Sequence, residues 1–155
     1  MATWITDRTL SDVNRVKELH DKAVSGTLAE TERLEWVAGM KGALSYMDYN
    51  RIESGVAELA RFVGATVSTK TTWTEEEFLT TSSASRWLSN ITNIRAKCSG
   101  PGSLPAIPSN MNNLGFQTMN DIETILSEIE RIANDHLLYC DVHRQGSRNI
   151  WRHWS

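Results

Sequence analysis

His136, Cys140 and His143 are the residues whose types and spacing best fit a metal site. On one continuous helix, positions four and three residues apart share a face, so these three side chains would converge on an ion. A fourth ligand would have to come from Cys98 or His153. Because nothing else in the sequence frames a site, we interpret the group as a capping histidine beside a buried thiol, and we predict no metal.

The sequence carries no motif for phosphate binding or nucleophilic catalysis. It contains neither Gly-x-x-x-x-Gly-Lys-Ser/Thr nor Gly-x-Gly-x-x-Gly, and it lacks the Gly-x-Ser-x-Gly turn. The run Glu75-Glu76-Glu77 offers carboxylates for acid–base chemistry, but acidic residues are also favoured at the positive end of a helix dipole. We therefore predict no catalytic residue, no cofactor and no enzymatic activity.

The C-terminal residues combine indole rings with basic side chains, in the order Trp151-Arg152-His153-Trp154. In an extended chain the two indoles share one face and Arg152 lies on the other. Such a pair can dock into a protein groove, stack on a sugar, lie at a membrane interface or cover the domain's own core. We predict that Trp151, Arg152 and Trp154 contact a partner, with Trp4 and Trp73 as second candidates.

Length and composition indicate a globular protein with one main domain. The chain has 155 residues, of which 40% are hydrophobic, and its formal charge of -3 argues against a general affinity for nucleic acid. No stretch approaches the roughly 20 apolar residues of a membrane span, and the N-terminus lacks the pattern of a secretion signal. Two cysteines are too few for a disulfide framework, so we expect a product made in the cytoplasm, without nucleic-acid or membrane partners.

Apolar residues at helical spacing predict a mainly α domain of about five helices in a compact bundle. The expected helix starts are Ser11 or Asp7, the capping box at 27–30, Ser45 or Asp48, Thr81 to Ser83, and Thr118. Glycines are expected to end the first three helices, and the fifth is expected to run to about Leu138. The β-branched segment 67–73 is predicted to be extended or a short edge strand.

Two segments depart from the helical pattern. Residues 99–115 hold all three prolines and are predicted to form a crossover that packs along the bundle. Residues 139–155 are predicted to form a short extended or β-hairpin tail, or an arm that orders on a partner, with a turn at 145–147. We therefore divide the chain into a helical domain, 1–138, and an aromatic-basic tail, 139–155.

An internal echo links two expected helix starts. The pattern Asp-x-Asn-Arg-(Val/Ile) occurs at 12–16 and again at 48–52, and a weaker version begins at Asn120. Asp favours helix starts and the apolar positions face inward, so local helix chemistry explains most of the match. With only two good copies, we expect two similar helical hairpins packed side by side.

Several blocks of sequence occur in an order that resembles a known family. They are 4–13, 32–36 with 39–42, 46–53, 87–91, 104–105 with 111–114, and 120–126. Together they resemble a helical module of minor structural and tail proteins of phages and prophages from Gram-positive bacteria. The resemblance covers about residues 4 to 135, and the family brings no catalytic residues to transfer to this chain.

The resemblance implies a virion component at the tail tip, baseplate or fibre attachment, made in the bacterial host cytoplasm. Its expected partners are other virion structural proteins, further copies of itself in a symmetric assembly, and a host-surface glycan. Because the chain ends soon after the fifth helix, we expect an adaptor whose tail docks on a neighbour. The alternatives are a carbohydrate- or cell-wall-binding module, a small cell-wall-acting enzyme, and a cytoplasmic helical regulator.

Overall fold

The computed structural model describes residues 3–97, 104–111 and 114–150, and for 136–150 it describes the backbone alone. Within these ranges the chain forms five α-helices and no strand. Their bounds are α1 Leu10–Ser25, α2 Glu30–Val37, α3 Tyr46–Val63, α4 Thr81–Arg95 and α5 Phe116–Ile150. The prediction of a mainly helical fold with five helices is confirmed.

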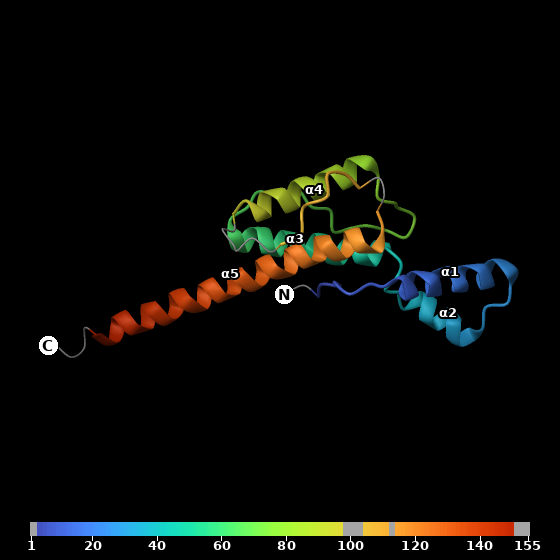
Figure 1. The fold of residues 1–155 in the computed structure, drawn as a ribbon, viewed down its shortest axis with the longest axis horizontal. Helices are drawn as coiled ribbons and strands as arrows, with labels where there is room; N and C mark the ends of the chain where they lie inside the picture. Colours follow the sequence, from blue (N-terminus) through green and yellow to red (C-terminus); the bar gives the residue numbers. More distant parts are fainter. Residues whose placement is uncertain (1–2, 98–103, 112–113, 151–155) are drawn as a thin grey trace.

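Three helices, α3, α4 and α5, pack against one another and form the core (Figure 1). They run in the same direction, so each connection must return the chain along the core before the next helix begins. The buried apolar side chains come mainly from these helices and include Ile52, Leu59, Ile91, Ile122 and Ile129. The core is therefore a bundle of three helices, whereas the sequence predicted a bundle of about five.

The other two helices, α1 and α2, form a hairpin that stands beside the end of the core where α3 begins (Figure 1). Leu19 is the only fully buried residue of α1, and α2 has no buried residue. The hairpin therefore packs on itself and adds little to the core. The expected pair of similar hairpins lying side by side is not what the chain forms, because α3 and α4 belong to the three-helix core.

Helix α1 starts and ends with local devices that the sequence partly indicated. Thr9, instead of Ser11 or Asp7, is the N-cap: its hydroxyl accepts from the amide of Asp12, whose carboxylate accepts from the Thr9 amide at 2.7 Å. At the other end Gly26 has φ 70°, a left-handed conformation that glycine adopts without steric cost.

Helices α2 and α3, like α1, each have an acidic residue in the first turn that accepts a hydrogen bond from the N-cap amide. The predicted capping box at 27–30 is wrong, because α2 begins at Glu30 and the Ala29 amide donates to Glu32 at 3.0 Å. For α3 both predicted residues take part, since Ser45 donates from its amide and hydroxyl to Asp48. Asp48 therefore has the position in α3 that Asp12 has in α1. The repeated Asp-x-Asn-Arg pattern thus corresponds to two helix starts of the same kind.

Residues 65–73 return the chain along α3 and α4 without forming a strand. Their backbone groups bond to side chains of the helices instead of to a neighbouring strand. The amide of Ser68 donates to Asn90 at 3.0 Å, and the amide of Trp73 donates to Asn50 at 2.8 Å. The predicted edge strand does not form here, and the asparagines bond to backbone groups that a neighbouring strand would otherwise bond to.

The described part of the predicted crossover, 104–111 and 114–115, is irregular. Leu104, Ile107 and Leu114 pack against the core and Met111 is buried in it. Residues 98–103 and 112–113 lie outside the described part.

The predicted extended or hairpin tail is not confirmed, because α5 continues across residue 138 and through Gly146 to Ile150. A single glycine costs a helix only about 1 kcal/mol, so Gly146 need not end it.

Candidate functional site

In the part of the chain that the structure describes, two buried glutamates each form the centre of a cluster of hydrogen bonds and ion pairs. Glu53 of α3 and Glu123 of α5 are 1% and 0% exposed. A buried carboxylate is strongly destabilising unless cations and hydrogen-bond donors surround it. The groups that surround these two residues come from segments far away in the sequence, so the two clusters show how the chain is tied together.

The Glu123 carboxylate accepts hydrogen bonds from three residues. Arg51 Nη1 and Nη2 donate to its two oxygens at 2.6 and 3.0 Å, Arg8 Nη2 donates at 2.7 Å, and the amide of Ile5 donates at 2.7 Å. Asp48 lies 3.0 Å from Arg51 and 3.8 Å from Arg8, so two cations face two anions. Burial lowers the pKa of Arg51, but the hydrogen bond and charge of Glu123 and the nearby Asp48 outweigh burial and raise it.

This cluster fastens an N-terminal strap, residues 3–9, along α5. The amide of Arg8 donates to Asn120 at 3.0 Å, and Asn120 Nδ2 donates to the Arg8 carbonyl at 2.8 Å. Further along α5, the indole nitrogen of Trp4 donates to Glu130 at 2.8 Å. The strap thus runs antiparallel to α5, and it leads directly into α1.

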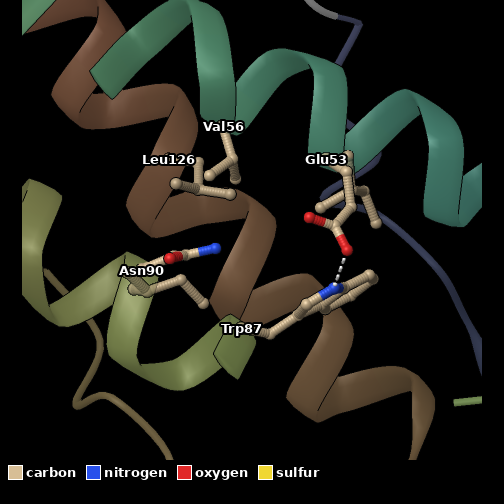
Figure 2. Close-up of a pocket in the computed structure, with 7 residues that line it drawn as sticks. Glu53, Val56, Trp87, Asn90 and Leu126 are labelled. Atoms are coloured by element: carbon tan, nitrogen blue, oxygen red, sulfur yellow. Dashed lines mark hydrogen bonds between the residues drawn. The ribbon is translucent and has the colours of Figure 1, made fainter. Parts of the chain in front are cut away.

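The Glu53 carboxylate joins α3, α4 and the return segment between them. Its Oε1 accepts from the indole nitrogens of Trp87 at 2.7 Å and Trp73 at 3.3 Å, and Arg86 donates to both oxygens. The amide of Lys70 donates to Oε2 at 3.1 Å. Figure 2 shows the carboxylate turned toward Trp87 across the gap between the helices.

The void beside this carboxylate is too small to bind a substrate. Its volume is about 10 Å³, and it is lined by Glu53, Val56, Trp87, Asn90 and Leu126, with two isoleucines (Figure 2). This is about the minimum space that one water molecule needs. Both clusters therefore have the chemistry of structural anchors, because their charges are neutralised within the protein and, among their described side-chain donors, only Arg8 Nε is buried without an acceptor.

A wider cleft of about 510 Å³ lies between the strap, the α2–α3 loop and the first turns of α3. Trp4, Met40 and Met47 supply apolar surface in it. Its charged groups already have partners: Lys41 lies 2.7 Å from Asp7, and the cleft's arginine belongs to the Glu123 cluster.

A second hollow, here called the Tyr49 groove, lies where α3, α4 and α5 begin. It has a volume of about 450 Å³, and its lining includes Tyr49, Phe78, Leu79, Met111 and Leu114. Phe78 is 76% exposed at its edge, whereas Tyr49 is buried, with its ring tilted against Trp73 and edge-on to Trp87. Burial raises the pKa of Tyr49. The lining is divided about evenly between apolar groups and polar ones, which include Thr80 and Thr81, and its apolar part suits contact with an apolar or aromatic group.

The hairpin presents a small apolar face to solvent. Leu34 and Val37, three residues apart on α2, are 63% and 74% exposed. Their spacing is that of an inner helix face, yet the structure exposes both to solvent. The inner contacts are ionic instead: Arg15 of α1 lies 2.8 Å from Glu35, and Lys22 lies 2.5 Å from Glu32.

The structure brings none of the sequence-predicted partner residues together. Trp73 is buried in the core with its indole nitrogen on Glu53, and Trp4 is half-buried with its nitrogen on Glu130. Trp151, Arg152 and Trp154 lie outside the described residues. The part of all five in partner binding stays a prediction.

Sequence reasoning missed the residues that form the two anchors: Arg8, Arg51, Glu53, Arg86 and Glu123. The signal for Arg51 was present, because it is the arginine of the repeated Asp-x-Asn-Arg pattern. The glutamates gave no local signal, since charged residues in a helix usually face solvent.

Among the described residues no three His, Cys, Asp or Glu side chains gather in a way that could hold a metal ion. The side chains of His136, Cys140 and His143 lie outside that part. None of the described helices is both long and apolar enough to cross a membrane.

No protein-family model, curated protein or solved structure matches the chain.

Proposed function

We propose that this protein is a structural component of a phage virion, at the tail tip, baseplate or fibre attachment, and that it acts through protein–protein contacts. One observation carries the proposal: two elements extend from the three-helix core in opposite directions, and their described side chains bury little against that core. These elements are the α1–α2 hairpin and the C-terminal half of α5 (Figure 1).

The hairpin supports the proposal through α2. A helix of eight residues is unstable by itself in water, and α2 buries none of its side chains in the domain. Its outer face, Leu34 and Val37, is available to a neighbouring protein because the hairpin stands clear of the core. Covering two aliphatic side chains would add about 1.5–3 kcal/mol each to an interface.

Helix α5 supports the proposal at the other end. Ile129 is its last buried residue among the described side chains, yet the helix continues to Ile150, roughly 30 Å further. Most helical stability in proteins comes from packing, so a projecting helix of this length favours a neighbour along it. The resemblance to phage tail modules supports a phage virion as the assembly that supplies that neighbour.

Mass spectrometry of purified particles of the encoding phage or prophage tests the proposal. We expect the protein in particles at a fixed stoichiometry. The substitution Val37→Glu places a charge on the outer face of α2 and is expected to reduce incorporation at least tenfold. Val24→Glu is the matched control, because Val24 is similarly exposed, at 77%, but lies on α1.

Absence of the wild-type protein from purified particles would overturn the proposal. Equal loss of incorporation in both valine variants would show that added charge, and not the outer face of α2, causes the effect. Circular dichroism of both variants establishes that each one folds.

A further inference from the structure

We propose that the Tyr49 groove receives the C-terminal segment 151–155 of a second copy, so that copies join head to tail. The inference rests on the proposed function, because it names one of the contacts through which such an assembly component would act. It also gives the predicted partner residues of the tail a specific docking place.

The shape and lining of the groove favour an aromatic occupant. Its volume of about 450 Å³ lies within the usual range of roughly 300–1,000 Å³ for binding pockets. Tyr49 and Phe78 supply aromatic rings, and Leu79, Met111 and Leu114 supply aliphatic surface. A methionine adapts its shape to an incoming ring. Phe78, 76% exposed, is left for an occupant to cover.

The charge beside the groove complements the charge of the tail. Glu75 and Glu76 are exposed and closely precede Phe78 in the sequence. The segment 151–155 has two tryptophans with an arginine between them and no acidic residue. Indoles in the groove and a guanidinium near its acidic edge form a complementary pair of surfaces, and such complementarity favours one partner over others.

The geometry of α5 requires the tail to come from another molecule. The groove lies where α3, α4 and α5 begin, and α5 carries the C-terminus away from that end (Figure 1). The helix has 35 residues and is therefore about 50 Å long. The five residues after it span at most about 17 Å when extended. A tail on a straight α5 cannot reach its own groove.

A contact between two different surfaces of identical copies is heterologous. It leaves one groove and one tail free on each pair, so it generates a ring when the rotation closes and a filament when it does not. Both outcomes are repetitive assemblies of the kind that a virion contains.

A complementation experiment tests the inference with two variants of the full chain. Phe78→Glu blocks the groove but keeps the tail, whereas Trp151→Ala/Trp154→Ala removes the indoles but keeps the groove. Phe62→Glu on α3 is the matched control, because Phe62 is also exposed, at 45%, and does not line the groove. Analytical ultracentrifugation measures association, and circular dichroism verifies folding.

We expect the wild type and Phe62→Glu to self-associate as concentration rises. Each blocked variant alone is expected to associate at least tenfold more weakly, and an equimolar mixture of the two is expected to form a one-to-one complex. A mixture that remains monomeric, or association that Phe78→Glu leaves unchanged, would overturn the inference. A monomeric wild-type protein that is nevertheless present in particles would overturn the head-to-tail contact and leave the proposed function standing.

Discussion

Arg8 and Glu123 are 115 residues apart in the sequence, and their side chains meet at 2.7 Å. Both side chains are almost fully buried, at 2% and 0% exposure. The pair connects the strap directly to the N-terminal part of α5, and Arg51 of α3 adds a second guanidinium to the same carboxylate. Three distant segments of the chain are therefore held at one point.

We predict that Glu123→Gln strongly destabilises the protein. The amide has nearly the shape of the carboxylate but no charge, so it leaves the guanidinium of Arg8 buried without its main counter-ion. Removing one partner of a buried ion pair costs about 3–5 kcal/mol. Urea unfolding followed by circular dichroism measures the change in the free energy of unfolding.

The same substitution at Glu128 is the control. Glu128 pairs with Arg131 on the surface of α5, and both side chains are largely solvent-exposed. Exposed pairs contribute about 0–1 kcal/mol, so Glu128→Gln should change stability little. Similar losses for the two variants would contradict the view that Glu123 is an anchor.

We also predict that Trp87→Phe destabilises the core more than Trp36→Phe does. Trp87 is 3% exposed, and its indole nitrogen donates to the buried Glu53 at 2.7 Å. Phenylalanine removes that donor and leaves a small cavity, which together cost about 2–4 kcal/mol. Trp36 is 39% exposed, so its loss should cost less than about 1 kcal/mol. Equal midpoints of thermal unfolding for the two variants would refute this prediction.

The sequence predicts the helices better than their arrangement, for a physical reason. Periodicity and caps act within a few residues, so α3 from Ser45 to Gly64 and the start of α4 at Thr81 could be predicted closely. The division into a core and a hairpin depends on which apolar faces meet. Leu34 and Val37 have the spacing of an inner face, yet they are exposed, and ion pairs such as Arg15–Glu35 join α2 to α1.

The anchors could not be predicted for a related reason. Glu53 and Glu123 are buried only because donors from distant segments surround them. The sequence near each glutamate does not indicate which distant residues will contact it. The Asn50 contact to the backbone of Trp73 likewise depends on the return path of the chain. The sequence pointed to Trp73 as a candidate partner contact, whereas its indole nitrogen donates to Glu53 inside the core.

We predict that acid loosens the hairpin before the core. Hydrogen bonds from Lys22 lower the pKa of Glu18 and Glu32, and a hydrogen bond from Arg15 lowers the pKa of Glu35. A carboxyl group with a pKa lowered by folding stabilises the fold while ionised, and this contribution is lost as the pH falls below about 4.

Amide hydrogen exchange at neutral and acidic pH measures this effect. Protection factors in α2 should fall before those of the part of α5 around Ile125, and high salt at neutral pH should weaken the hairpin in the same direction. The variant Arg15→Gln should show a smaller response to acid because the ion pairs of Arg15 with Glu18, Glu32 and Glu35 are already absent. Protection of α2 that is insensitive to both acid and salt would contradict the prediction.

Gly42 provides the most local test of how the hairpin is attached. A Cβ atom built on Gly42 would lie 2.2 Å from the carbonyl oxygen of Asp12 and 2.6 Å from the amide nitrogen of Val13. Both are backbone atoms, so no side-chain rotation relieves the clash, and Gly42→Ala must move the α2–α3 loop away from α1. Such overpacking typically costs about 1–3 kcal/mol.

Gly115→Ala is the control, since nothing lies within 4 Å of a Cβ there and we expect a change below about 1 kcal/mol. Chemical shifts of the α1 amides, measured with the free energy of unfolding, locate the effect: they should change in Gly42→Ala and not in Gly115→Ala. If Gly42→Ala has wild-type stability and unchanged α1 shifts, the loop does not hold the hairpin in the way described.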